Sequence, residues 1–180
     1  RQFGFDPAQL DAYRKGILNS ELPEGTSYTY GNRMRKYFGL DTLDEIVKRL
    51  KLDPNDRRLF ISLWDSKNDL ALNELKDSSF PCLTDLYFVN HDGKLMLTAG
   101  FRTHNAISAW LLNLYGLRSI QEYVAQGADL EPGKINVKSR WIGLNPEESR
   151  LGSVMELVKK SRKIKIDTND PRGYFIIGVR

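Results

Sequence analysis

The only cysteine of this 180-residue sequence is the side chain best suited to covalent chemistry. Cys82 directly follows Pro81; Arg102 comes 20 residues after it, and Asn113 comes 31 residues after it. A thiolate is a strong nucleophile, a guanidinium can bind an anion through two hydrogen bonds, and an amide both donates and accepts. These residue types therefore predict a nucleophile accompanied by two substrate-binding groups.

A β-hairpin is predicted to bring Cys82 and Arg102 together. Residues 83–90 and 94–101 have the apolar, β-branched and aromatic content of strands, and residues 91–93 (His-Asp-Gly) form a turn sequence between them. The outer ends of two antiparallel strands of similar length lie side by side. We therefore expect Cys82 and Arg102 to share one site.

Asn113 interrupts an apolar segment. Residues 105–115 are apolar nearly all round, which indicates a buried helix that Gly116 ends, and residues 117–126 indicate a second helix. A buried amide needs partners for up to four hydrogen bonds. Asn113 is therefore either satisfied by the backbone or reserved for a ligand, and the segment by itself leaves both roles open.

Two neighbouring arginines precede a predicted strand. Arg57 and Arg58 follow the turn cluster 53–56 and lie at the beginning of strand 59–64. Because adjacent strand residues point to opposite faces of a sheet, both side chains can serve one ligand only at a strand end or a sheet edge. The alternative is a pair of solvated side chains.

The other elements alternate between helical and extended patterns. Helix starts are indicated by Asp6-Pro7 and by Asn145-Pro146, where a capping side chain precedes a proline in the first turn. The remaining predicted segments are helix 6–19, helix 41–51, helix 67–76, strand 134–139, helix 145–160 and a terminal strand over 174–180.

Composition narrows the class of partner. Lys and Arg number 27 against 23 for Asp and Glu, and this net charge of +4 suits a phosphorylated small molecule as well as nucleic acid. The basic run Lys159 to Lys165 most simply complements a helix C-terminus, so a nucleic-acid partner is not expected, although a basic nucleic-acid-binding module remains the third hypothesis. His91 and His104 lack a second ligand at metal-binding spacing, so no metal is expected.

Cysteine content and hydropathy indicate the compartment. A single cysteine cannot form an internal disulfide, and no apolar run reaches the roughly 20 residues that cross a bilayer. We therefore expect a cytoplasmic protein without a membrane partner. The chain begins at Arg1 rather than Met, so we expect a piece of a longer protein, with one domain over 1–166 and a terminal strand, 167–180, that either belongs to it or starts an appended domain.

Six features follow one another along the chain: Tyr30-Gly31 with Arg33 and Arg35, Asp41 with Leu43, Arg57-Arg58 before a strand ending in Trp64, Pro81-Cys82, Arg102-Thr103, and Asn113. This order resembles that of thymidylate synthases, and the spacing from Cys82 to Arg102 and Asn113 is the same as in that family. The chain resembles the thymidylate synthase and pyrimidine nucleotide hydroxymethylase superfamily over roughly residues 27–145, and is most similar to the archaeal-type members.

The resemblance implies an α+β fold with a curved mixed sheet flanked by helices, and a homodimer formed through the sheet. In such a dimer, Arg57 and Arg58 would reach into the partner's site and bind the phosphate of a pyrimidine nucleoside monophosphate. Arg102 and Thr103 would bind that phosphate from the same subunit, and Asn113 would recognise the edge of a uracil base. Tyr30 and Asn105 complete the expected set of substrate-binding residues.

The same resemblance implies one-carbon transfer to C5 of a dUMP-like substrate. Cys82 would add to C6, and the carbon would come from a reduced folate (methylenetetrahydrofolate) or a methanopterin analogue, without a metal. The alternatives are a pyrimidine nucleotide hydroxymethylase, in which water attacks the exocyclic methylene, and a non-catalytic relative that binds the nucleotide.

Four departures from the family pattern keep these alternatives open. Leu83 stands where the family has a histidine, and Asn105 stands where it has an aspartate that contacts the pterin. Gly143 and Asn145 align with a His-x-Tyr pair that holds the deoxyribose hydroxyl. The general-base glutamate of the family would lie upstream of Arg1.

Overall fold

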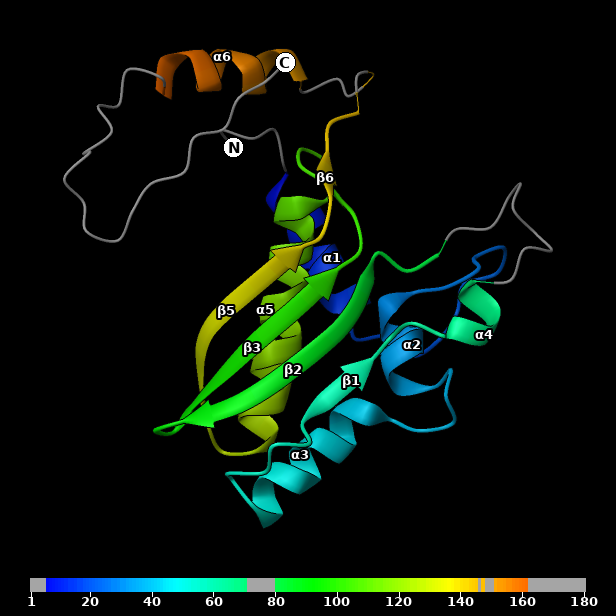
Figure 1. The fold of residues 1–180 in the computed structure, drawn as a ribbon, viewed down its shortest axis with the longest axis vertical. Helices are drawn as coiled ribbons and strands as arrows, with labels where there is room; N and C mark the ends of the chain where they lie inside the picture. Colours follow the sequence, from blue (N-terminus) through cyan, green and yellow to red (C-terminus); the bar gives the residue numbers. More distant parts are fainter. Residues whose placement is uncertain (1–5, 71–79, 146, 148–150, 162–180) are drawn as a thin grey trace.

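A four-stranded sheet carries the hairpin predicted around Cys82. The computed structural model describes residues 6–70, 80–145, 147 and 151–161. Strands β2 (Leu83–His91) and β3 (Lys94–Phe101) form the antiparallel hairpin, and β1 (Phe60–Ser62) pairs antiparallel with β2. Strand β5 (Glu131–Ser139) pairs parallel with β3, which gives the order β1-β2-β3-β5 (Figure 1). The sheet is therefore mixed and mostly antiparallel.

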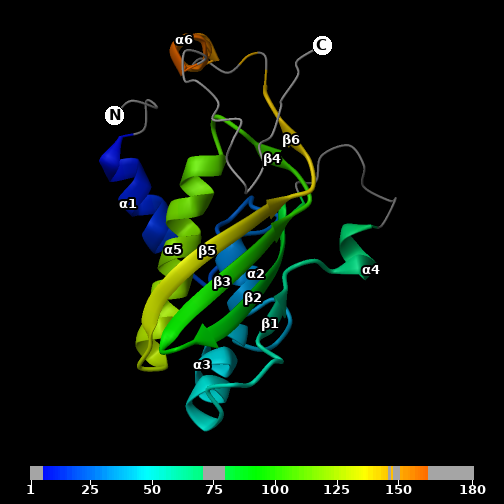
Figure 2. The same cartoon turned by 60° about the vertical axis from the view of Figure 1, so that its left-hand side comes forward.

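One face of the sheet is covered by helices. Helix α5 (Trp110–Gly127) packs against β3 and β5, and α1 (Pro7–Gly16) packs beside α5, as Figure 2 shows. Helix α3 (Thr42–Leu52) also contacts α5. The core lies between sheet and helices, where alternate strand residues meet the apolar stripes of the helices. Its fully buried members include Leu86, Phe88, Leu97, Ala99, Ile120 and Val124.

Shorter elements extend the chain around this core. Helix α2 (Tyr30–Arg35) precedes α3, and α4 (Ser66–Asp69) follows β1. Strands β4 (His104–Asn105) and β6 (Ile142–Gly143) pair parallel beyond the ends of β3 and β5 (Figure 2). Helix α6 (Leu151–Ser161) ends the described part of the chain. No helix within the described ranges is both long enough and apolar enough to cross a bilayer.

The prediction of two helices separated at Gly116 is wrong, because α5 runs unbroken from Trp110 to Gly127. Gly116 is buried inside this helix where α1 crosses it. A Cβ atom at Gly116 would collide with the side chains of Ile17 and Tyr13. The glycine therefore permits close helix packing and does not end the helix.

The first part of the apolar segment 105–115 is also not helical. Asn105 Oδ1 accepts hydrogen bonds from the backbone N–H groups of Ile107 and Ser108, both at 2.9 Å. This side chain stabilises a turn before the helix, and α5 accordingly begins only at Trp110.

Other element boundaries differ in smaller ways from those expected. Residues 146 and 148–150 of the helix predicted from Asn145 lie outside the described residues, and α6 is described from Leu151. Strand β5 begins three residues earlier than expected, at Glu131. Helix α1 ends at Gly16 and β1 spans only Phe60–Ser62. The predicted terminal strand, the expected boundary after residue 166 and most of the predicted helix 67–76 lie outside the described residues.

Helix α2 was not predicted, and two local features explain it. Thr29 Oγ1 accepts a hydrogen bond from Asn32 N at 3.0 Å, which caps the helix. Gly31 lies against the turn that follows α1, and a Cβ atom there would collide with the backbone oxygen of Asn19. Because backbone atoms cannot move aside as a flexible side chain can, Gly31 is required for the position of α2 and of the adjacent Tyr30.

We predict that Gly31→Ala destabilises the protein by about 2 kcal/mol or more, because the added methyl forces the backbone of residue 19 or of α2 to shift. Gly16→Ala is the matched control: a Cβ there meets no atom within 4 Å, and alanine favours the helix over glycine by up to about 1 kcal/mol. Urea denaturation measures both. Equal stabilities of the two variants would contradict the proposed close approach.

Candidate active site

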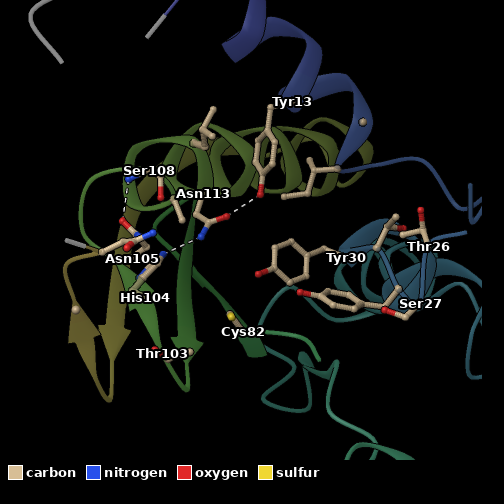
Figure 3. A pocket seen from close by; sticks show the side chains of 18 of the residues that line it. Tyr13, Thr26, Ser27, Tyr30, Cys82, Thr103, His104, Asn105, Ser108 and Asn113 are labelled. Atoms are coloured by element: carbon tan, nitrogen blue, oxygen red, sulfur yellow. Dashed lines mark hydrogen bonds between the residues drawn. The ribbon is translucent and has the colours of Figure 1, made fainter. Parts of the chain in front are cut away.

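A cavity of about 1150 Å³ lies between α1, the segment that leads into α2, and the ends of the strands (Figure 3). Small-ligand pockets usually measure about 300–1,000 Å³, so this cavity has room for two small molecules side by side. Its wall includes five predicted site residues from three parts of the chain: Tyr30, Cys82, Thr103, Asn105 and Asn113.

Cys82 lies at the point where the chain enters β2. Its backbone oxygen accepts a hydrogen bond from Arg102 N at 2.9 Å, and the next residue pair, Leu83 and Phe101, is in register in the hairpin. The thiol is free and half-buried. The structure thus confirms that the two ends of the hairpin bring Cys82 and Arg102 together.

The guanidinium of Arg102 holds the segment before Cys82. Its Nε donates to Pro81 O at 2.9 Å, its Nη2 donates to Phe80 O at 3.1 Å, and it lies 5.7 Å from the centre of the Trp64 ring. Two of its five N–H donors are used in this way, which leaves three for an anion. Thr103 lines the cavity, whereas Arg102 lies just outside the lining.

Arg57 and Arg58 are not near the Cys82 of their own chain. Phe60 pairs with Tyr87, five residues along β2 from Cys82, so the arginines lie more than about 16 Å from it at 3.3 Å per residue. Arg58 forms a two-pronged ion pair with Asp56, through Nε at 2.9 Å and Nη2 at 3.1 Å. This pairing, together with Arg49, holds the pKa of Asp56 well below its usual range.

The phenols in the cavity remain protonated over the physiological pH range. Burial raises the pKa of Tyr30 far above its usual value, and Figure 3 shows its hydroxyl pointing into the cavity. Burial also raises the pKa of Tyr13, with a smaller contribution from Tyr28. These side chains can therefore act as hydrogen-bond donors beside Cys82.

Asn105 offers less to a ligand than its position suggests. Its Oδ1 accepts two backbone hydrogen bonds, which fill both lone pairs of the oxygen. Only the Nδ2 group can then contact a ligand. An aspartate with a second carboxylate oxygen would have kept an acceptor available.

Asn113 is bonded through both ends of its amide to other side chains (Figure 3). Oδ1 accepts from the Tyr13 hydroxyl at 2.6 Å, and Nδ2 lies 2.8 Å from His104 Nε2. His104 Nδ1 in turn lies 2.8 Å from Ser139 Oγ. The sequence left open whether the Asn113 amide bonds to backbone groups or is reserved for a ligand. Bonding to backbone groups is wrong, because its partners are side chains.

Tyr13 and His104 are site residues that the sequence analysis missed. Tyr13 lies in the segment predicted as helix 6–19, for which no role in the site was predicted, and His104 was considered only as a metal ligand. The available signal was the place of His104 inside the Arg102–Asn105 run, since a histidine between two expected ligand contacts must lie near the ligand. Among the described residues, no three His, Cys, Asp or Glu side chains gather where they could hold a metal.

The fold and the site together define an α+β protein with a cysteine-bearing hairpin beside a cavity large enough for a nucleotide. The family model described as thymidylate synthase matches residues 19–142. The chain belongs to the thymidylate synthase family, as its resemblance predicted.

Similar proteins occur in archaea. Proteins named "Putative thymidylate synthase" are 37% identical over 131 residues in Methanothermobacter thermautotrophicus and 39% identical over 136 residues in Methanopyrus kandleri. The matches cover 73% and 75% of this chain, but 56% and 62% of those relatives. The chain therefore spans about three fifths of the length of the relatives that it matches.

A solved structure supports the fold. The thymidylate synthase from T4 phage superposes with a TM-score of 0.56 at 22% identity, over 70% of this chain and 42% of the phage protein. At this identity, the likeness shows the thymidylate synthase fold and carries no conclusion about individual residues.

We predict that His104 makes the protein less stable as the pH falls. Burial lowers the pKa of His104, so below its unfolded-state value of about 6.5 the unfolded chain binds a proton that the folded protein does not. Stability is therefore retained above about pH 6.5 and is lost as the pH falls from there through the folded-state pKa. One proton limits this slope to about 1.4 kcal/mol per pH unit.

Urea unfolding of the wild type and of His104→Gln at pH 7.5 and pH 5.5 measures the slope. The variant should be less stable at both values but should depend less on pH. His91→Gln, which removes the exposed histidine at the end of β2, is the control with which the slope of His104→Gln is compared. An unchanged slope in His104→Gln would contradict the prediction.

Proposed function

We propose that the protein transfers a one-carbon unit to C5 of a pyrimidine nucleoside monophosphate of the dUMP type, with Cys82 as the nucleophile. The observation that carries this proposal is that Cys82 and Asn113 line one cavity. A thiol and an amide that share a cavity can act on opposite edges of one pyrimidine ring. The family supports this reaction class, because it is the activity that the family's name describes.

The covalent step needs a thiolate and a group that stabilises negative charge. The sulfur of Cys82 would form a bond to C6 while the C5–C6 π electrons move through C4 onto O4, which makes C5 nucleophilic. An N–H donor at O4 favours this step, since charge develops there only as the adduct forms. Nδ2 of Asn113 has a second N–H beyond the one directed at His104 and can serve O4.

Arg102 and Thr103 would bind the phosphate within the same subunit. Arg102 retains three N–H donors after its bonds to Phe80 O and Pro81 O, and its position directly beside Cys82 suits an anion bound at the cavity mouth. Because the same guanidinium fixes the segment before Cys82, phosphate binding and placement of the nucleophile would be coupled.

A reduced folate or a methanopterin analogue would supply the carbon. The cavity fits such a group: its volume of about 1150 Å³ exceeds what a nucleotide needs, and Trp141 and Leu144 expose apolar surface in its lining. These two residues would pack against the flat pterin ring, and Asn105 Nδ2 would donate a hydrogen bond to it.

A homodimer would explain the positions of Arg57 and Arg58. They lie too far from their own Cys82 to reach its ligand, so they can bind a phosphate only in another subunit. The face of the sheet opposite α5 exposes Phe60 and Val89, which are 55% and 38% accessible and can pack against a second sheet. We propose that the dimer forms through this face.

The first test is turnover. With C5-tritiated dUMP and methylenetetrahydrofolate, the wild type should release tritium, and Cys82→Ala should reduce the release at least about 10³-fold because the covalent adduct cannot form. Cys82→Ala should still bind dUMP in calorimetry, which separates loss of chemistry from loss of folding. Equal release by the wild type and the variant would remove Cys82 from the mechanism.

The same assay distinguishes the alternatives. A 5-hydroxymethyl product would identify a hydroxymethylase. Binding of dUMP without tritium release, and without any effect of the folate on binding, would identify a nucleotide-binding relative that does not catalyse the transfer. Failure to bind dUMP, UMP or dCMP would contradict the proposed substrate class.

A second test concerns the partner subunit. Arg57→Ala/Arg58→Ala should weaken dUMP binding by about tenfold or more, because two phosphate contacts are lost. When this double variant is mixed with Arg102→Ala, hybrid dimers should recover one intact site and hence tighter binding than either parent. If the mixture binds dUMP no more tightly than the two variants do separately, phosphate binding across the interface is contradicted.

A further inference from the structure

Four side chains from four different elements form one continuous hydrogen-bonded chain, and three of them line the cavity. The order is Tyr13 on α1, Asn113 on α5, His104 on β4 and Ser139 on β5, joined at 2.6, 2.8 and 2.8 Å. Figure 3 shows the first three of these side chains. Asn113 is 6% exposed and His104 is 3% exposed. Buried polar groups need partners, and these groups find them in one another.

The ring of His104 has a fixed plane. It stacks on the fully buried Phe101 at a centroid distance of 4.0 Å and an interplanar angle of 20°. Hydrogen bonds at both nitrogens prevent rotation within that stack. His104 therefore presents its Nε2 to Asn113 as a rigid partner.

The bond from Tyr13 determines which way round the amide lies. A separation of 2.6 Å is normal when a hydroxyl donates to an oxygen, but it is shorter than the 2.7–3.2 Å usual for an N–H donor. The atom of Asn113 beside Tyr13 is therefore its oxygen, and the amide nitrogen faces His104. This orientation makes Nε2 of His104 the acceptor and places its proton on Nδ1, directed at Ser139 Oγ.

The amide keeps one lone pair and one N–H after these two bonds. Their order in space is fixed, with the acceptor on the Tyr13 side and the donor on the His104 side. Uracil offers a donor at N3 and an acceptor at O4, whereas cytosine offers an acceptor at N3 and a donor at N4. Because addition of Cys82 to C6 fixes the orientation of the base, only one of the two patterns matches.

We infer that Tyr13 and His104 are positioning residues that lock the Asn113 amide and so set the preference of the site for uracil-type over cytosine-type nucleotides. This inference rests on the proposed function. Without the Tyr13 hydroxyl, the amide can rotate by 180°: its oxygen then accepts from the other tautomer of His104, and its nitrogen faces the space that the hydroxyl left. The rotated amide matches cytosine.

The test is the ratio of the dissociation constants for dCMP and dUMP, measured by calorimetry. Tyr13→Phe should lower this ratio by about tenfold, because the amide orientation that matches uracil is no longer favoured over the rotated one. Tyr115→Phe is the matched control, since Tyr115 is an exposed tyrosine on α5, and it should keep the wild-type ratio. A merely structural loss would weaken binding of both nucleotides alike and leave the ratio unchanged.

The outcomes separate the inference from the proposed function. A wild type that binds neither nucleotide overturns the function, and the inference with it. A wild type that prefers dUMP, with an unchanged ratio in Tyr13→Phe, overturns the inference alone. A lowered ratio in Tyr13→Phe together with an unchanged one in Tyr115→Phe supports it.

A second measurement needs no nucleotide. The protein contains two histidines, so ¹⁵N spectra of the imidazole rings at pH 8 can be assigned with His91→Gln. The wild type should show His104 with its proton on Nδ1, and Tyr13→Phe should show a mixture of the two tautomers. A proton on Nε2 in the wild type would overturn the inference.

Discussion

The antiparallel register of β2 and β3 is the constraint on which the site depends. Leu83 pairs with Phe101, and the adjacent hydrogen bond from Arg102 N to Cys82 O joins the two outer ends of the hairpin. The register shifts between Leu83 and Asp85, so that Leu83 and Leu86 are both buried although they are three residues apart. The thiol and the guanidinium thus emerge together at one end of the sheet, beside the short β4–β6 pair.

Two glycines allow helices to approach closely and so complete the cavity. Gly116 lets α1 cross α5, which brings Tyr13 to Asn113, and Gly31 lets α2 lie against the turn after α1, which places Tyr30. Both positions would collide with neighbouring atoms if they carried a side chain. The two glycines keep side-chain volume out of these contacts. The partly buried phenols of Tyr13 and Tyr30 then line the cavity, and burial raises their pKa, which keeps them protonated.

The charged groups divide between a buried structural ion pair and arginines for which we propose ligand-binding roles. Arg33 and Asp69 form a buried ion pair at 2.7 Å that joins α2 to α4, and no described residue accepts from Arg33 Nε. Arg58 is held by Asp56, and Arg102 is held by backbone oxygens. Arginines placed in advance lose less conformational entropy when an anion binds, because their rotamers are already restricted.

The sequence by itself determined the hairpin, the apolar periods and the spacing of Cys82, Arg102 and Asn113, and these led to the family and the fold. Such features are local, since turn residues, caps and alternating burial act over a few neighbours. Only the tertiary structure decided that Asn113 bonds to Tyr13, 100 residues away. It also decided that the side-chain oxygen of Asn105 accepts hydrogen bonds from the backbone of a turn. It also decided that α5 continues through Gly116 and that Arg57 and Arg58 lie far from their own Cys82. These outcomes depend on which distant elements pack together, and the residue pattern around each position does not contain that information.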